Sequence, residues 1–297
     1  TWVLPAVRNL YRDDETGLSA DSVADALVRT EEMLLLASDL EVELSGGDLL
    51  VRVINQTGHK LPTGYPEGRR MWINVRFYDA EGALLAERGA YDHETATLTP
   101  DTVVYEAVLG IDETLAAIVN RPAGPGFHFA LNNKWYKDNR IPPRGFTNAA
   151  FAAVQCAPVA AAYPDGAYWD EQRFTPPRDA ASAEVRVYYQ TTSREYIEFL
   201  RDENITDDAG QIAYDQWLTT GRSAPVEIDY ATITLPAGDC AGDVTGDGAV
   251  TFDDLAVLLS HFDTASGASR ADGDLDGDGD VDLADLALLL RHFEVPC

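Results

Sequence analysis

The C-terminal part of the chain contains two copies of one short acidic pattern. The segment GDVTGDGAVTFDDLAVLLSHF at 242–262 realigns on GDLDGDGDVDLADLALLLRHF at 273–293 with an offset of 31 residues. In each copy, oxygen-bearing side chains stand at loop positions one, three, five, nine and twelve, and glycine stands at position six. Carboxylates crowded in this way repel one another. The segment is therefore either built around a cation or a solvated acidic run.

This spacing is that of a calcium loop, in which a hard cation takes about six to eight oxygen ligands and the glycine permits a sharp turn. We favour it over a solvated run because both copies enter an apolar helix, and we predict two bound Ca²⁺ ions. The first loop carries fewer charges, since Thr245 stands where a carboxylate or amide is usual, and we expect it to bind the weaker ion. The predicted ligands of the first loop are Asp243, Thr245, Asp247, the carbonyl of Ala249, Thr251 directly or through water, and Asp254. Those of the second loop are Asp274, Asp276, Asp278, the carbonyl of Asp280, Asp282 and Asp285.

Both loops end on Asp rather than Glu, and each is followed by a helix without a clear helix before it. Over residues 239–297 this combination resembles the type I dockerin family, calcium-dependent modules that fasten secreted enzymes or surface proteins to cohesin domains. The resemblance implies a small α-helical, EF-hand-like module that uses the ligands just named. It also implies a cohesin-like or cell-surface partner, contacted by exposed residues of the two helices.

The chain departs from the dockerin pattern at loop positions ten and eleven, where the family usually has a pair of hydroxyl residues. Here the pairs are Phe252 with Asp253 and Leu283 with Ala284. An apolar pair fits either a hydrophobic cohesin interface or an intramolecular contact without any cohesin. The repeated histidines at the helix ends are interpreted as structural or capping residues rather than metal ligands; they are His261 and His292.

The charge distribution divides the chain. From Asp239 onward there are 14 acidic and 2 basic residues, so −12 of the net charge of −28 belongs to this part. We predict domains at 1–236 and 239–297, with PAGDC at 236–240 as the linker. A chain this acidic does not suit a nucleic-acid backbone, which requires clustered Lys and Arg.

The chain is expected to act outside the cytoplasm. No window approaches the about 18 consecutive apolar residues that a membrane span needs. The sequence begins at Thr1 rather than at Met, so we interpret it as a processed or excised piece whose missing front has room for an export signal. Together with the dockerin resemblance, this predicts a secreted, extracellular or cell-surface protein of a bacterium.

Two of the three cysteines, Cys240 and Cys297, flank the acidic segment. They predict a disulfide that joins its ends, which requires an oxidising compartment; two free thiols are the alternative. Cys156 is left over, and its apolar surroundings in AVQCAPV predict a buried, unpaired thiol or one that has lost its partner.

The larger domain alternates with a period of two residues, and we predict a mainly β fold, an immunoglobulin-like β-sandwich with a few helices. DAEG at 79–82 predicts a hairpin turn. Helical spacing predicts helices at 19–37, 193–203 and 210–221. The predicted strands are 49–55, 71–78, 83–91, 103–109, 127–131, 184–190 and 226–235.

Two long loops of this domain, 56–70 and 132–147, exceed ordinary hairpin lengths, and such loops often carry function. The first contains His59, Arg69 and Arg70, and its arginines suit carboxylates; a self-braced loop is the alternative. Next to the second loop lies His128. With Lys134, Trp135, Tyr136, Arg140 and Arg144 it frames either an anionic or aromatic ligand or a salt-bridged loop.

Three segments, GHKLPTGYPEGRRMW, DNRIPPRGFTNAAF and YYQTTSREYIEFLRDEN, together resemble the heme-free C-terminal region of secreted bacterial multiheme c-type cytochromes. The Cys-x-x-Cys-His sites of such proteins lie upstream, and none occurs here. The resemblance therefore implies heme c only on an upstream domain or partner chain, and a role in extracellular electron transfer. It implies that His59 approaches or ligates a heme edge and that Arg69 or Arg70 meets heme carboxylates, with His128 as a further cofactor-binding candidate.

Catalytic motifs are missing from the sequence. There is no G-x-S-x-G elbow, H-E-x-x-H, P-loop or Rossmann glycine pattern. We therefore predict a non-catalytic accessory or assembly protein. The alternative is an extracellular polysaccharide-acting hydrolase or sugar-binding module carried on a dockerin, whose aromatic candidates for stacking on sugars are Trp135, Tyr136, Tyr163, Tyr168 and Trp169.

Overall fold

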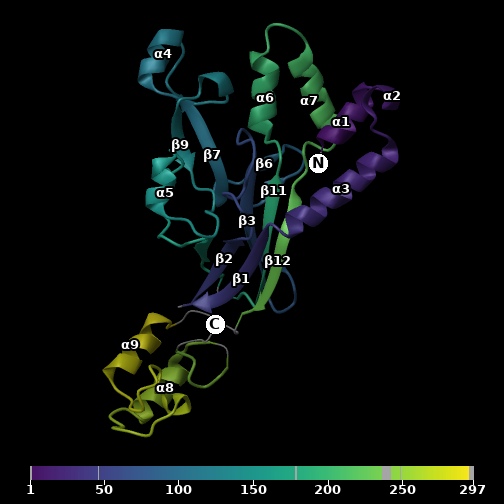
Figure 1. The fold of residues 1–297 in the computed structure, drawn as a ribbon. Coiled ribbons are helices and arrows are strands. Elements are labelled where there is room, and N and C mark those ends of the chain that lie inside the picture. The colour runs from purple at the N-terminus through teal and green to yellow at the C-terminus, as the bar shows by residue number, and fades with distance from the viewer. Residues whose placement is uncertain (1, 46, 178, 236–241, 248, 294–297) are drawn as a thin grey trace. The chain divides into compact units, whose positions relative to one another are not determined.

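The structure, a computed structural model, describes residues 2–45, 47–177, 179–235, 242–247 and 249–293. The chain divides into two compact units, coloured along the sequence in Figure 1. The first comprises Thr1–Arg76, Ala86–Thr175 and Glu184–Ile233. The second comprises Phe77–Leu85, Pro176–Ala183 and Thr234–Cys297.

The described strands form a three-stranded sheet, a larger sheet and one short pair. The first has the order β1 (Ser38–Ser45), β2 (Asp48–Asn55), β10 (Trp169–Phe174), all antiparallel. The larger sheet has the order β12 (Val226–Thr234), β11 (Ser182–Gln190), β3 (Arg70–Tyr78), β7 (Val104–Ile111), β8 (Gly124–Pro125). In addition, β4 (Leu84–Arg88) pairs with β3, β9 (Lys134–Asp138) pairs with β7, and β5 (Tyr91–Asp92) pairs with β6 (Thr97–Leu98). The fold is consistent with the predicted mainly β class, and its immunoglobulin-like character stays a prediction.

Three charged side chains stand directly opposite one another across the three-stranded sheet. Arg52 in β2 stands opposite Glu41 in β1 and Glu171 in β10. Its guanidinium donates to Glu41 at 2.8 Å through Nη1 and to Glu171 at 2.8 Å through Nε. Opposite charges placed directly across neighbouring strands stabilise that pairing, and a slip of one residue would turn every side chain to the other face.

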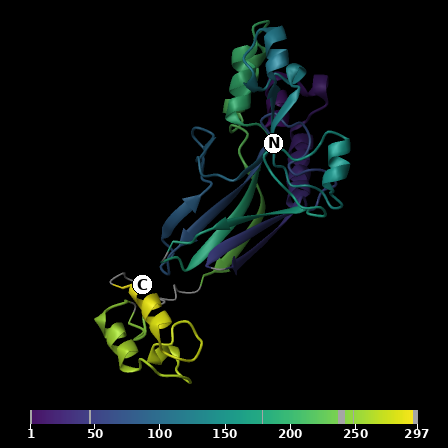
Figure 2. The same ribbon diagram turned by 90° about the vertical axis from the view of Figure 1, so that its left-hand side faces the viewer.

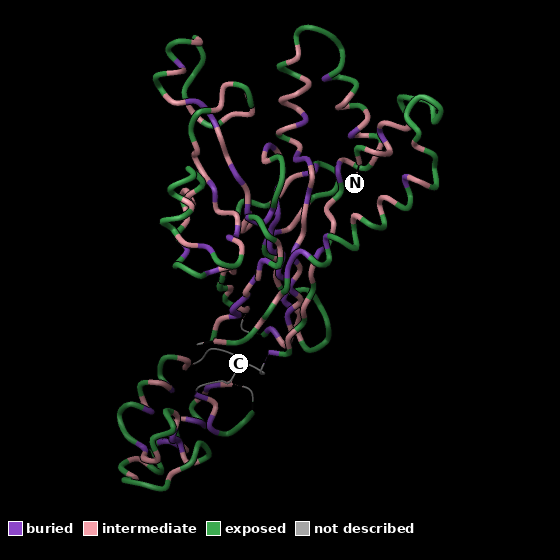
Figure 3. Tube along the Cα trace, viewed as in Figure 1, coloured by how far each residue is buried: buried purple, intermediate pink, exposed green. Residues whose placement is uncertain are grey.

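The centre of the larger sheet is β3, which has β11 on one side and β7 on the other. Its run Met71, Trp72 and Ile73 is buried without alternation, as expected for a strand covered on both faces. Trp72 stacks on Tyr91 and packs against Tyr188, each with ring centroids 5.6 Å apart. Figure 3 shows the buried positions gathered along the strands and the exposed ones along the helices and connections.

Four helices of the first unit, α3 to α6, begin at side chains that accept a hydrogen bond from a helix amide. Ser19 accepts from Ser22 N before α3 (Ala20–Leu35), and Ser193 accepts from Tyr196 N before α6 (Arg194–Glu203). Such N-caps satisfy amides that have no partner within the helix. The other helices are α1 (Val3–Leu10), α2 (Asp13–Thr16), α4 (Glu113–Val119), α5 (Asn148–Ala153) and α7 (Ala209–Thr219). In Figures 1 and 2, α6 and α7 stand side by side beyond one end of the strands.

Most predicted elements of the larger domain are confirmed. The strands predicted at 49–55, 71–78, 103–109, 184–190 and 226–235 correspond to β2, β3, β7, β11 and β12, and the three predicted helices to α3, α6 and α7. The predicted turn at 79–82 is present, since Asp79 N donates to Ala83 O and Gly82 N to Asp79 O. The linker predicted at 236–240 lies outside the described residues. None of the helices described is long and apolar enough to cross a bilayer.

One predicted strand is wrong, and three strands of five residues or more were missed. Residues 127–131 alternate as FHFAL, but the chain turns there into a 3₁₀ helix, η1 (Phe129–Leu131), closed by Leu131 N donating to His128 O. The predicted loop 132–147 contains β9, which pairs with β7. β1 and β10 also escaped the sequence analysis, because their residues alternate with charged ones at the edges of a sheet.

We predict that Gly210→Ala destabilises the first unit by about 1–3 kcal/mol, the usual cost of overpacking. A Cβ on Gly210 would lie 2.3 Å from the carbonyl oxygen of Leu200, so α6 and α7 would have to separate. Gly58→Ala is the matched control, because its Cβ meets no atom within 4 Å. Chemical denaturation of both variants measures the difference, and equal stability would show that the helix pair relaxes freely.

Candidate functional site

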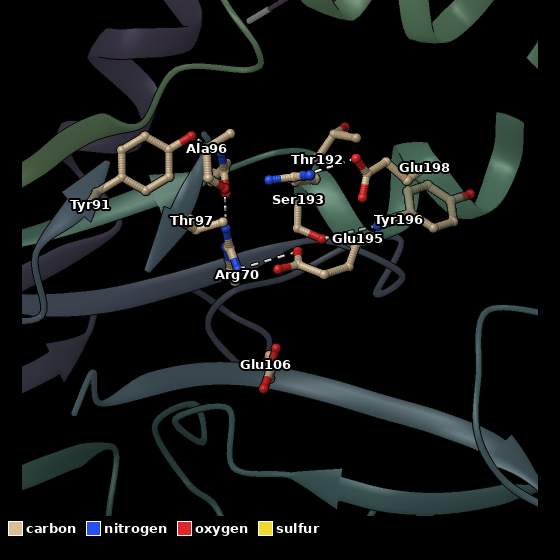
Figure 4. A network of polar contacts seen from close by, with 12 residues as sticks. Arg70, Tyr91, Ala96, Thr97, Glu106, Thr192, Ser193, Glu195, Tyr196 and Glu198 are labelled. Carbon is tan, nitrogen blue, oxygen red and sulfur yellow. Dashed lines mark hydrogen bonds and ion pairs between the residues drawn. The ribbon is translucent and has the colours of Figure 1, made fainter. Parts of the chain in front are cut away.

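The two arginines predicted to bind ligand carboxylates are both occupied inside the first unit. Arg70 is buried, donates from Nε to Gln190 Oε1 at 2.8 Å, and lies 3.6 Å from Glu195 Oε2. Figure 4 shows it reaching from β3 toward Glu195 at the start of α6. Arg69 donates from Nη1 to the carbonyl of Thr63 and lies over the ring of Tyr189. These contacts favour the self-braced loop, while the heme-carboxylate role of the two arginines stays a prediction.

The four cofactor candidates do not gather at one place. Arg69 and Arg70 line a cavity of about 510 Å³ together with Glu67, Glu106, Lys137 and Glu195. His128 lines other cavities, with Arg121 and Glu203. His59 is exposed; its carbonyl accepts hydrogen bonds from Asn55 Nδ2 and Thr57 Oγ1, and its ring contacts none of the described residues through a hydrogen bond.

The two long loops, separate in the sequence, are tied together. Leu61 and Ile141 exchange backbone hydrogen bonds of 2.9 Å. Asn55 is fully buried, and its Nδ2 lies 2.9 Å from the carbonyl oxygen of Ile141 and 3.0 Å from that of Pro142. The loops thus form one structural unit, which the sequence analysis treated as two clusters.

A buried ion cluster completes this connection. Asp138, which is 1% exposed, accepts from Lys60 Nζ at 2.7 Å and from Arg140 Nε and Nη2 at 2.8 and 2.9 Å. Burial opposes ionisation of Asp138, but the hydrogen bonds and charges of Arg140 and Lys60 outweigh it and lower its pKa. Neither Lys60 nor Asp138 was singled out from the sequence, because only the pairing of distant loops brings them together.

The remaining basic and aromatic residues of the second loop brace one another. Lys134 lies 4.6 Å from the ring centroid of Tyr136, and Arg144 lies 4.3 Å from that of Tyr168. These cation–π contacts favour the braced loop over a ligand frame. Of the aromatic residues considered for sugars, Tyr163 is buried and donates to the carbonyl of Asn139 at 2.7 Å.

The prediction for Cys156 is wrong in one respect. The residue is exposed, in the turn that follows α5, and it is a free thiol. Its amide donates to the carbonyl of Phe151, which turns the chain outward at the helix end. Cys240 and Cys297, the predicted disulfide partners, lie outside the described residues.

We predict that Asp138→Asn destabilises the first unit by about 3 kcal/mol at pH 7, because it leaves the Lys60 charge buried without its partner. Since the folded-state pKa of Asp138 is lowered, its stabilisation is present above the unfolded pKa of about 3.9 and is lost as the pH falls through the folded value. The difference between wild type and variant in chemical denaturation should therefore shrink below about pH 4. Asp101→Asn, at an exposed pair, is the control, and a difference independent of pH would contradict the ionic role.

In the second unit, the carboxylates of each acidic loop converge. Atoms of Asp243, Asp247 and Asp254 lie within 4.8 Å of one another in the first loop. The second loop brings together Asp274, Asp276 and Asp278, and likewise Asp280, Asp282 and Asp285. Thr245 points into the first loop, with Oγ1 3.0 Å from Asp254 Oδ1. The donors are all oxygens, the ligand type that calcium prefers.

The aspartate at position twelve holds each loop closed. In the first loop, Asp254 is fully buried and accepts from the amides of Val244, Thr245 and Thr251 at 2.8–2.9 Å. Burial opposes its ionisation, but these hydrogen bonds outweigh burial and lower its pKa. In the second loop, Asp285 does the same, accepting from Leu275, Asp276 and Asp282 amides at 2.7–3.1 Å, and its pKa is also lowered.

Two other carboxylates of the second loop, Asp276 and Asp280, are not balanced in this way. Desolvation and then the charges of neighbouring aspartates raise the pKa of both Asp276 and Asp280. Asp280 Oδ1 is buried and has no hydrogen-bond partner. The turns that bring these groups together use Gly277 and Gly279 at φ +78° and +91°, a conformation that glycine adopts without strain. An oxygen ligand for a cation is the role that these residues fit.

Each loop leads directly into a helix. α8 (Phe252–Ser260) begins at Thr251 and α9 (Leu283–Arg291) at Asp282, both with a capping box closed by the position-twelve aspartate. Only a single 3₁₀ turn, η2 (Arg270–Asp272), precedes the second loop. The helices pack over a small core of Val244, Val250, Leu258, Val281 and Leu289.

Residues 241–294 match the dockerin type I domain. The segment is therefore a calcium-dependent docking module, as predicted, and the acidic clusters fit calcium. The ligand set and the presence of two ions stay predictions. His261 and His292 stand at the C-cap positions of α8 and α9, which is consistent with their interpretation as capping residues.

Comparisons with other known proteins say little about the residues outside the dockerin module. None of the curated proteins compared with it matches. A crystal structure of a penta-heme cytochrome c552 from Thermochromatium tepidum aligns over 69% of this chain and 41% of its own, with 17% identity and a TM-score of 0.38. This chain thus spans less than half the length of that cytochrome, and a likeness of this size supports no statement about fold or function.

The dockerin module exposes the same apolar residues on both helices. On α8, Phe252 and Leu259 are 68% and 51% exposed; on α9, the equivalent Leu283 and Leu290 are 71% and 52% exposed. In each helix the two residues are seven positions apart and therefore share a face. Phe252 packs edge-on against Phe293, with ring centroids 5.0 Å apart, which sets the start of α8 beside the end of α9.

We predict that calcium removal unfolds the dockerin module, since metal binding supplies its folding energy. Chelation should reduce far-ultraviolet circular dichroism and open residues 242–293 to proteolysis, and calcium should restore both. Titration calorimetry should find two ions. Unchanged spectra and proteolysis after chelation would contradict the prediction.

Two matched substitutions sharpen this test. Asp243→Asn should weaken calcium binding to the first loop by about tenfold or more, because a hard cation loses a charged oxygen ligand. Asp253→Asn removes the same charge from an exposed position outside the carboxylate cluster and should leave binding nearly unchanged.

Proposed function

We propose that this protein is a non-catalytic, secreted or cell-surface accessory protein that is attached to its partner by the C-terminal dockerin module. In this proposal residues 239–297 form the docking domain and residues 1–236 form the β-rich domain that is carried. The match to the dockerin type I domain at 241–294, with converging carboxylates in both loops, is the observation that carries the proposal.

The apolar stripes of α8 and α9 are the proposed docking surface. Large apolar side chains that stay more than half exposed on both helices of so small a module are typical of an interaction site. Phe252 and Leu283 stand at loop position ten, where the dockerin family usually has hydroxyl residues. The surface therefore suits a cohesin-like protein with a hydrophobic interface. Phe252 also contacts Phe293 within the module, but both Phe252 and Leu283 keep more than half of their surface exposed.

The nature of the carried domain is the finer part of the proposal. A heme-bearing domain or chain as its neighbour, with a role in extracellular electron transfer, follows only from the sequence resemblance and stays a prediction. The same holds for the alternative, a polysaccharide-acting hydrolase or sugar-binding module. Arg69 and Arg70 have partners within the chain and Tyr163 is buried, so these three residues support neither interpretation.

We predict that Phe252→Asp with Leu283→Asp lowers affinity for a cohesin partner by at least about a hundredfold, since apolar contacts at the centre of an interface dominate binding. The measurement is surface plasmon resonance of the full chain over a panel of purified cohesin domains, with calcium present. Ile118→Asp, at an exposed apolar position of the first unit, is the control. Binding that survives the double substitution, in a variant that still takes up calcium, would exclude the stripes as the docking surface.

A further inference from the structure

The first unit contains an apolar groove that neither the calcium loops nor the Arg70 contacts use. Its volume is about 740 Å³, within the range of small-molecule sites. It lies between the segment around η1 and the helices α6 and α7. Its apolar wall consists of Phe127, Phe129, Leu131, Phe199, Leu200 and Ala213.

The wall of this groove is built from rings in mutual contact. Phe127 packs against Phe199 with centroids 5.6 Å apart, and His128 meets Phe199 edge-on at 4.9 Å. The rim is apolar as well, because Phe129 is 61% and Ile205 is 92% exposed. Large side chains at such exposure stabilise the fold little, so they are better explained by a ligand or partner.

One cation stands in the wall of the groove, and its orientation is fixed. Arg121 Nη1 lies 2.6 Å from His128 Nε2 and 3.1 Å from Glu203 Oε2. A guanidinium carries five N–H donors. The Nε and Nη2 donors of Arg121 make no side-chain hydrogen bond to any residue that the structure describes. This free edge has the fork geometry that holds a carboxylate by two parallel hydrogen bonds.

We propose that the groove binds a small apolar carboxylic acid, with its hydrocarbon part on the aromatic wall and its carboxylate on the free edge of Arg121. Glu203 also lines the groove, but its Oε2 is paired with Arg121 Nη1 at 3.1 Å, so an amine would meet the arginine charge without a free carboxylate. A sugar would leave its hydroxyls against phenyl rings, and desolvated hydroxyls without hydrogen bonds are unfavourable. The inference goes beyond docking, because no residue of the dockerin module takes part.

The test is titration calorimetry of the calcium-loaded full chain with decanoate, decanol and decylammonium, each below micelle formation. Decanoate should bind best, decanol about tenfold or more weaker because it lacks the charge-assisted pair, and decylammonium weakest. Equal affinity for the three ligands, or no binding of decanoate, would overturn the proposal.

Variants distinguish the contribution of the ligand's carboxylate to binding from that of the apolar wall. Arg121→Gln should abolish the preference for decanoate over decanol while decanol still binds. Ala130→Trp, at an exposed position of the wall, should weaken both ligands by filling the groove. Arg88→Gln, at an exposed pair away from the groove, is the control. Decanoate affinity unchanged in Arg121→Gln would overturn the role of the arginine.

The same samples test whether a second copy of the chain covers the groove. Light scattering should find the same particle mass for wild type and Ile205→Asp. A dimer that Ile205→Asp converts into monomers would assign the groove to self-association and overturn the proposal.

Discussion

A carboxylate withdrawn from water must find charges or N–H groups that replace its hydration, and this requirement organises both units. In the first unit, Asp138 meets it with two cationic side chains, and the pairing holds two long loops against each other. In the second unit, Asp285 meets it with backbone amides and Asp254 with backbone amides and the hydroxyl of Thr245, and the loops close around them. In the second calcium loop, hydrogen bonds do not offset desolvation and repulsion at Asp276 and Asp280, whose pKa values are raised.

The partners of a buried carboxylate are close in sequence in the calcium loops and far apart in the two long loops. This explains which parts of the protein could be predicted from the sequence. The dockerin module was predictable because its donors lie within about a dozen residues of one another and the pattern occurs twice. The contacts between the two long loops join residues that are 78 to 87 positions apart, and no local pattern specifies them. Asn55, Lys60 and Asp138 were therefore overlooked, while the strands between them, whose period depends on local sequence, were mostly found.

The errors have local causes. At 127–131 the alternation of Phe127 and Phe129 suggested a strand, but the chain turns there. Both rings pack against a tyrosine pair, Phe127 on Tyr196 and Phe129 on Tyr65, whose rings contact each other. Cys156 has apolar neighbours in sequence, yet it follows a helix of six residues whose last turn is exposed. Arg69 and Arg70 were predicted to bind a ligand because arginine pairs well with carboxylates. In the structure both donate hydrogen bonds to residues of the same chain.

The burial of Asn55 has a consequence for how the protein can be produced. Asn55-Gln-Thr matches the sequon for attachment of N-linked glycans. Its Nδ2, the atom that would carry the sugar, is enclosed among the carbonyl oxygens of His59, Ile141 and Pro142. A glycan on that nitrogen is incompatible with the joined loops. A eukaryotic secretory host that modifies the nascent chain before these loops meet would trap it unfolded, so a host without that machinery, or replacement of Thr57 by a residue outside the sequon, is the safer route to folded protein.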